Sequence, residues 1–231
     1  MDKSGVDALM ERASSALAQG DYFETAGLAR RALDQARRDD DFERMARVCL
    51  PLQEARRLIR EQALDAGRVV PVSALPSGRV RLEPGCYDVH PPAVGITANS
   101  LRAMLDRRRV PAMVVAREPA TREGRWPVVL VGSGQFMPVV ARAKVAPPPD
   151  GAATPAWMLA AHEALGDAAI AQVRPEWPAD HRVDDLLERL EGLPDHEKLM
   201  QALATACREA ARLESRSPPR RRTPLDDPYG F

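Results

Sequence analysis

The sequence predicts an α+β fold in which an N-terminal helical hairpin and a third helix precede a small mixed β-sheet with one helix, and further helices follow. Apolar residues recur at helical spacing in the first 68 residues and again after residue 150. Between them, short apolar runs alternate with glycine and proline, which is typical of strands separated by turns. We therefore divide the chain into segments 1–68, 69–150 and 151–215. The remainder, 216–231, is rich in proline and charge, which favours a disordered tail.

A tight turn in the first segment is encoded locally. Gly20 stands where the end of a helix favours a left-handed residue, and Asp21 can cap the following helix with Glu24 as its capping-box partner. The flanking helices are expected over about 6–19 and 22–38. A third helix is expected from about residue 40 to Gly67, bent at Pro51.

Small and apolar residues occur in both helices beside this turn, at Leu9, Ala13, Ala16, Ala32 and Leu33. Together with Gly20-Asp21-Tyr22, this pattern resembles the tetratricopeptide repeat, a unit of two antiparallel helices with small residues at their contact. Thr25 and Arg37 depart from the alanine and proline that the family favours. The resemblance covers about one and a half units and implies a partner-binding groove. An alanine-rich hairpin packed on the rest of the protein is the alternative.

The middle segment is expected to contain six short strands, at 69–72, 80–82, 86–89, 112–116, 128–131 and 138–145. Thr97 is expected to cap a helix whose apolar side carries Leu101 and Leu105. A helix between two strands predicts a crossover between parallel strands. The last two strands are expected to form a hairpin around residues 132–135. The result is a small mixed sheet with one helix on a face.

The third segment is expected to contain three helices. Thr154 as N-cap and Pro155 in the first turn predict a helix to about residue 173. Asp180 is expected to cap a short helix that ends near Gly192, and a last helix is expected over about 195–213.

Composition limits the class of protein. Apolar residues make up 45% and charged residues 29% of the 231 residues, and the 33 basic and 33 acidic side chains cancel. There is no apolar run typical of a signal peptide or a membrane span, so we expect a cytoplasmic protein without membrane association. The alanine and arginine content suggests a bacterial source. Three cysteines far apart in the sequence, Cys49, Cys86 and Cys207, indicate reduced thiols.

One strand carries three side chains with chemical potential. Cys86, Asp88 and His90 alternate along it, so a thiol, a carboxylate and an imidazole would share one face. A thiol-dependent enzyme centred on Cys86 is therefore one hypothesis, and a strand between two turns is the plainer explanation.

Metal and cofactor sites are not expected. His162-Glu163 begins like a zinc-binding helix, but Gly166 stands where the second histidine is required. The glycines at 132 and 134 precede a strand and not a helix, so they cannot place a phosphate at a helix N-terminus.

The middle segment is basic, with 11 Lys and Arg side chains against 6 Asp and Glu. Its excess charge includes Arg102, Arg107, Arg108, Arg109, Arg117, Arg122 and Arg125. Such a group can contact phosphates, so nucleic-acid binding is a second hypothesis, although no aromatic residues are interleaved for base stacking. Complementing the dipole at the end of a helix also explains residues 107–109.

These patterns favour a non-enzymatic, intracellular protein-interaction or adaptor module that binds a protein partner through the helical hairpin. A nucleic-acid-binding protein that uses the basic middle segment is the alternative, and a thiol-dependent enzyme is the third. Arg220, Arg221 and Arg222 in the tail suggest a short docking segment or a solubilising end.

Overall fold

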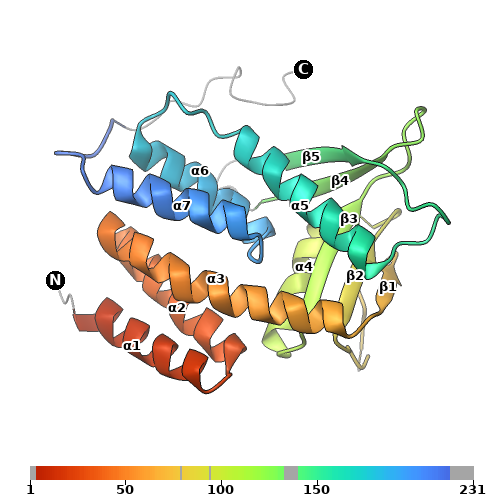
Figure 1. The fold of residues 1–231 in the computed structure, drawn as a ribbon, viewed down its shortest axis with the longest axis horizontal. Helices are drawn as coiled ribbons and strands as arrows, with labels where there is room; N and C mark the ends of the chain where they lie inside the picture. Colours follow the sequence, from red (N-terminus) through yellow and green to blue (C-terminus); the bar gives the residue numbers. More distant parts are fainter. Residues whose placement is uncertain (1–3, 79, 94, 133–139, 219–231) are drawn as a thin grey trace.

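The computed structural model describes all residues except 1–3, 79, 94, 133–139 and 219–231, and in this part of the chain it contains seven helices and five strands (Figure 1). Helices precede and follow the sheet in the sequence, which confirms the predicted α+β class. Within the same residues, no helix combines the length and the apolar character needed to cross a bilayer. The expected turn at 132–135 and most of the expected tail lie outside the described residues.

The first three helices are α1 (Ser4–Ala18), α2 (Tyr22–Arg38) and α3 (Phe42–Asp65). The first turn has the predicted geometry, because Gly20 has a φ of +76° and the Asp21 carboxylate accepts a hydrogen bond from the Glu24 N–H at 3.1 Å. The second turn repeats it: Asp40 has a φ of +52°, and the Asp41 side chain caps α3. The backbone conformation and the helix cap of both turns therefore come from neighbouring residues.

Helices from both ends of the sequence form one array. α1, α2, α3, α7 (Glu197–Ala210) and α6 (Ala179–Gly192) pack side by side in that order (Figure 1). The remaining C-terminal helix, α5 (Pro155–Ala171), begins after its predicted cap, Thr154, and packs on the sheet. The C-terminal helices therefore cover the side of α3 that α1 and α2 leave open.

The predicted start of α6 is wrong. Pro178 occupies the N-cap position and Asp180 lies buried in the first turn of the helix. Its carboxylate accepts hydrogen bonds from the backbone N–H groups of His181 at 3.0 Å and Ser217 at 2.8 Å. Asp180 is thus used to hold the chain that follows α7, a role that depends on tertiary contact.

The sheet contains β1 (Val69–Val72), β2 (Gly85–Val89), β3 (Ala112–Arg117), β4 (Trp126–Val131) and β5 (Val140–Val145), in sequential order. β1, β2 and β3 are parallel to one another, whereas β4 is antiparallel to both β3 and β5. α4 (Gly95–Arg107) connects β2 with β3, which confirms the predicted crossover.

Two predictions for the middle segment are wrong. Residues 80–82 form no strand: Val80 and Arg81 are both exposed, and only the half-buried Leu82 packs against the core. Thr97 does not cap α4, which begins at Gly95. A Cβ atom on Gly95 would lie 2.4 Å from Cγ2 of Val131, so the helix starts where glycine permits this close approach.

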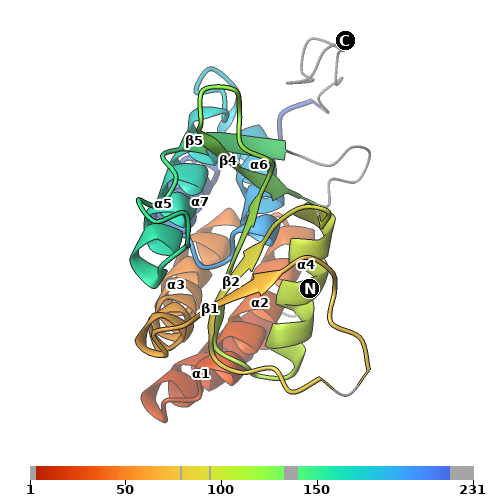
Figure 2. The ribbon, with the colours of Figure 1, turned by 90° about the vertical axis from the view of Figure 1, so that its right-hand side faces the viewer.

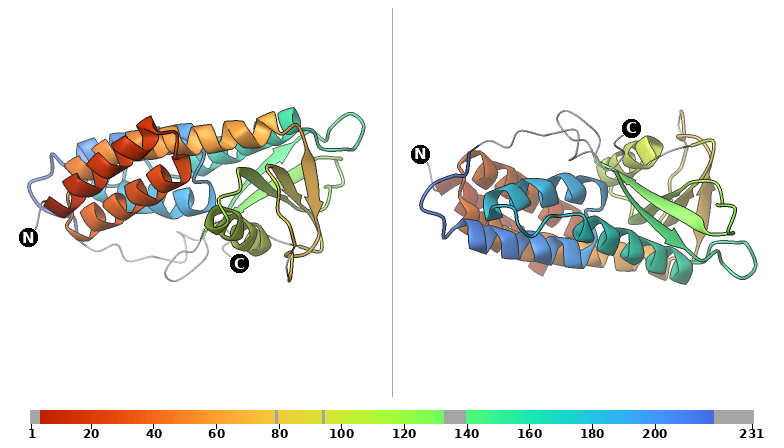
Figure 3. Two further views of the ribbon diagram at one scale, coloured as in Figure 1. Left: turned by 90° about the horizontal axis from the view of Figure 1, so that it is seen from below. Right: turned by 90° about the horizontal axis from the view of Figure 1, so that it is seen from above.

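The two faces of the sheet are covered differently (Figure 2). α4 packs on one face, where Leu101 and Leu105 belong to a cluster with Tyr87 and Val114. The other face joins a larger core that includes residues of α1, α2, α3, α5, α6 and α7. The three sequence segments therefore share one hydrophobic core. Figure 3 shows that the helical array lies at one end of the molecule and the sheet at the other, with α3 reaching from one to the other.

Candidate functional site

Cys86 lies on β2, and His90 directly follows that strand. Cys86 is completely buried in the larger core. Burial, and then the negative charge of Asp195, raise the pKa of its thiol to about 11. The imidazole of His90 is half-buried, and its Nδ1 lies 3.0 Å from the carbonyl oxygen of Pro91. At neutral pH the Cys86 sulfur is therefore held as the weakly nucleophilic thiol.

Asp88 and Arg117 form an ion pair on the face of the sheet that α5 covers. Nε of Arg117 donates to both carboxylate oxygens of Asp88, at 3.0 and 3.1 Å, and the guanidinium carbon lies 4.1 Å from the ring centre of Trp126. The rings of Trp126 and Trp157 meet edge to face with centroids 5.4 Å apart. The structure thus pairs Asp88, one of the three side chains predicted on this strand, with Arg117, one of the seven predicted basic residues. Arg117 neutralises the buried Asp88 carboxylate.

The other arginines of the basic set are spread over the middle segment. Arg102 is half-buried and donates to the Val114 carbonyl at 3.1 Å. Arg109 pairs with Asp21, in the turn between α1 and α2. Besides Arg109, the exposed arginines of the set are Arg107, Arg108, Arg122 and Arg125. The first two precede β3 and the last two follow it. The strand, about 20 Å long at roughly 3.3 Å per residue, separates the two pairs.

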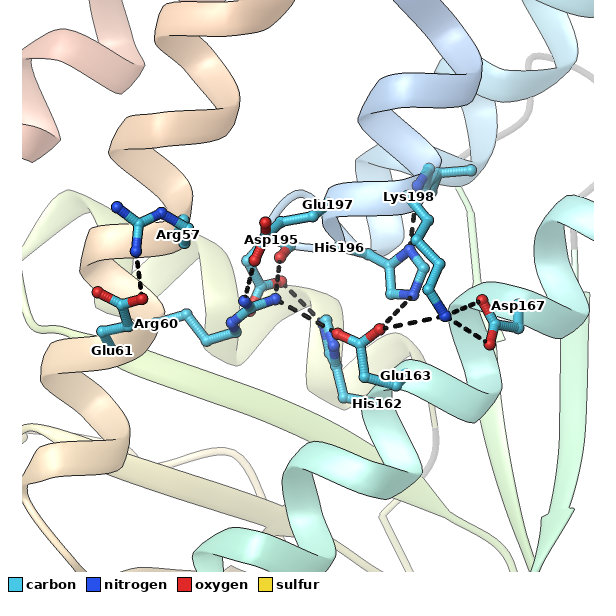
Figure 4. A network of polar contacts seen from close by, with 11 residues as sticks. Arg57, Arg60, Glu61, His162, Glu163, Asp167, Asp195, His196, Glu197 and Lys198 are labelled. Atoms are coloured by element: carbon cyan, nitrogen blue, oxygen red, sulfur yellow. Dashed lines mark hydrogen bonds and ion pairs between the residues drawn. The ribbon is translucent and has the colours of Figure 1, made fainter.

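A network of polar side chains lies where α3, α5 and the start of α7 meet (Figure 4). We call it the polar network; its members are Arg60, His162, Glu163, Asp167, Asp195, His196, Glu197 and Lys198. His162 and His196 are completely buried. Towards the surface, Nζ of Lys198 lies 2.9 Å from both carboxylate oxygens of Asp167 and 3.8 Å from Glu163.

The centre of the polar network is a hydrogen bond between the imidazole of His162 and the carboxylate of Asp195. Nε2 of His162 lies 3.1 Å from Oδ1 of Asp195. Burial alone would raise the pKa of this carboxyl, but the charges of His162, Arg102 and Arg60 hold it well below its usual range. Asp195 is therefore ionised, and the cations around it are needed to stabilise a buried negative charge.

His196 is the N-cap of α7, which starts two residues later than the sequence predicts. Nδ1 of His196 accepts a hydrogen bond from the Leu199 N–H at 3.1 Å, so the neutral ring carries its proton on Nε2, 3.4 Å from the Glu163 carboxylate. The ring fills the space beside Gly166, where a Cβ atom would lie 2.2 Å from it. Burial, and then the nearby charge of His162, lower the pKa of His196.

Arg60 connects α3 to this region. Its side chain is almost completely buried, donates to the Asp195 backbone carbonyl at 2.8 Å and pairs with Glu197. A second acidic partner, Glu163, lies 3.5 Å away. One arginine of α3 is thus bound by both α5 and the segment that starts α7.

The polar network joins three helices, and both of its imidazoles are sealed from solvent. In the part of the chain that the structure describes, no group of three or more His, Cys, Asp or Glu side chains is arranged to hold a metal ion. Sequence reasoning missed this network, since its members come from three distant segments. Its one local signal is Gly166, a glycine inside a helix one turn after His162.

Comparison of the chain with protein-family models, curated proteins and solved structures found no match.

Proposed function

We propose that this protein is a non-enzymatic protein-interaction module that binds a partner protein through the outward side of α3. The observation that carries the proposal is Leu50, whose side chain is 72% exposed in the middle of this helix. The other large apolar residues in the first three turns and around Leu50 are buried, namely Phe42, Met45, Val48 and Leu52. Leu50 is therefore the large apolar residue of α3 that is left exposed, whereas Leu58 and Leu64 are half-buried and the others are buried.

The surroundings of Leu50 have the composition of a small protein interface. Arg47 precedes it by one turn and Glu54 follows it by one turn, so an apolar centre is bordered by charges of both signs. α1 is held against α3 beside this surface, because Arg44 of α3 donates two hydrogen bonds to the Asp7 carboxylate, at 3.1 and 2.8 Å. We expect a partner surface with an apolar pocket and a mixed polar rim.

The two alternatives have weaker support. Thiol catalysis requires an accessible thiolate, whereas Cys86 is completely buried and its thiol pKa is raised. Nucleic-acid binding requires cations that follow a phosphate backbone, whereas the exposed arginines lie before and after β3.

Affinity capture from cells after chemical cross-linking tests the proposal. Leu50→Asp should lose the captured protein, because a carboxylate cannot enter an apolar pocket without a partner. Ile96→Asp is the matched control, since Ile96 is 63% exposed on α4. We expect wild type and Ile96→Asp to capture the same protein whether or not nuclease is added. Equal capture by Leu50→Asp, or capture that nuclease abolishes, would contradict the proposal.

A further inference from the structure

β5 is an outer strand of the sheet and can accept a further strand. It pairs with β4 over its whole length, from Val140 opposite Val131 to Val145 opposite Trp126. In the described part of the chain no strand pairs with its other side (Figure 1). The opposite outer strand, β1, is shorter and contains Pro71, which has no N–H to donate. β5 contains no proline, so it is the edge better suited to strand addition.

The pairing of β3 with β4 fixes which backbone groups of β4 face β5. The Glu118 N–H donates to the Pro127 carbonyl at 2.8 Å, so the carbonyl of Pro127 points towards β3. Along an antiparallel strand these directions alternate from one residue to the next. The backbone groups of Trp126 and Val128 therefore point towards β5.

The same alternation fixes which groups of β5 are directed outward. Val145 and Ala143 stand opposite Trp126 and Val128, so their N–H and C=O groups are used on β4. Arg142 and Lys144 occupy the alternate positions. Their backbone N–H and C=O groups consequently point to the open edge.

The side chains of Arg142 and Lys144 lie together on one face of β5. Ala141 and Ala143 pack into the core on the other face, which α5 covers, while Arg142 and Lys144 are exposed. Arg142 pairs with Glu118 of the neighbouring loop, and Lys144 has no ion-pair partner among the described residues. The exposed Arg122 and Arg125 precede β4, near the end of β5 that carries Lys144. With the acidic neighbours Glu118 and Glu123 counted, four cations stand against two carboxylates at this edge, so its net charge is positive.

We propose that β5 binds an extended, acidic segment of a partner protein as an additional antiparallel strand. Residues of that segment directly opposite Arg142 and Lys144 exchange backbone hydrogen bonds with them, and their side chains lie on the same face. The segment therefore carries carboxylates at two alternate positions, with an apolar residue between them beside Ala143. This site is separate from the Leu50 surface and does not rest on it.

Charge decides between an acidic segment and a second copy of this chain. Two antiparallel copies of β5 would bring the Arg142 and Lys144 side chains of one protomer against those of its partner, and like charges opposite each other are destabilising. Carboxylates at the same positions form favourable cross-strand pairs. The occupant is thus an acidic strand from another protein.

Fluorescence anisotropy with a labelled peptide of alternating glutamate and valine tests the charge requirement. We expect the wild-type protein to bind it, and the double variant Arg142→Glu with Lys144→Glu to bind at least about tenfold more weakly. The double variant Arg31→Glu with Arg212→Glu makes the same charge change at exposed positions outside the sheet and should bind like wild type. Absence of binding to wild type, or equal loss in both variants, would overturn the proposal.

N-methylated peptides test the backbone requirement. Methylating the glutamate nitrogens removes the N–H groups that face β5 and should weaken binding about tenfold, whereas methylating the valine nitrogens should leave it unchanged. Equal effects of the two methylations would exclude strand addition. Displacement of the peptide by a single-stranded RNA would point to phosphate recognition instead, and self-association that the Arg142/Lys144 variant abolishes would point to a second copy.

Discussion

Gly166→Ala is expected to destabilise the protein, although alanine favours a helix more than glycine does. The added Cβ would lie 2.2 Å from two atoms of the His196 ring, which is completely buried and cannot swing into solvent. Overpacking of this kind costs about 1–3 kcal/mol, and displacing His196 from its hydrogen bond to Leu199 costs about 1 kcal/mol more through loss of the α7 cap. The higher helix propensity of alanine offsets about 1 kcal/mol of this cost. The expected net loss is about 2 kcal/mol.

The unfolding midpoint in urea, followed by circular dichroism, measures this loss, and Tm should fall by about 4–8 °C for a chain of this size. Gly27→Ala in α2 is the matched control. Its Cβ would meet no atom within 4 Å, so the same substitution should stabilise the protein by up to about 1 kcal/mol. We therefore expect Gly166→Ala to lower the free energy of unfolding and Gly27→Ala to raise it. If Gly166→Ala is as stable as wild type, the close packing of His196 against α5 is refuted.

Three further predictions concern the turns and the buried polar groups. Gly20→Val should lower the free energy of unfolding by about 1 kcal/mol or more, because Gly20 has a φ of +76°; unchanged urea unfolding would argue against this turn. Because the pKa of His196 is lowered in the folded protein, stability should be full above about pH 6.5 and fall as the pH drops below it. His196→Asn keeps a capping oxygen but does not titrate, and urea midpoints at several pH values should show a weaker dependence in this variant. Arg117→Met should cost about 2 kcal/mol by leaving the Asp88 carboxylate without its cation, and adding Asp88→Asn should restore part of it; a double variant no more stable than the single one in urea would speak against this pair.

The sequence was informative where structure depends on a few neighbouring residues. The turn at Gly20 and Asp21 and the cap at Thr154 were predictable, because each is formed by side chains within four positions. The caps assigned to Thr97 and Asp180 were wrong for the opposite reason. The start of α4 is set by its close approach to β4, and Asp180 is occupied by the backbone after α7.

The polar network could not be predicted for the same physical reason. His162 and Asp195 are far apart in the sequence, and only the packing of α5 beside α7 brings them to 3.1 Å. Of the basic set, Arg117 could be recognised as a cation, but its use on Asp88 required the register of β2 with β3. Periodicity identifies the elements, whereas the partners of buried charges depend on how those elements pack.

α3 explains why the helical segments and the sheet form one body. Three of its arginines bind carboxylates in different neighbours: Arg44 binds Asp7 of α1, Arg56 binds Asp106 of α4, and Arg60 pairs with Glu163 of α5 and Glu197 of α7. About one and a half hairpins at the N-terminus would leave one side of α3 uncovered, and stable repeat arrays need about three units. α7 covers that side. A turn after Pro51, where a repeat unit would place one, would separate Arg44 from Arg56 and Arg60. The unbroken helix is therefore what allows a short helical array to be stabilised by the rest of the chain.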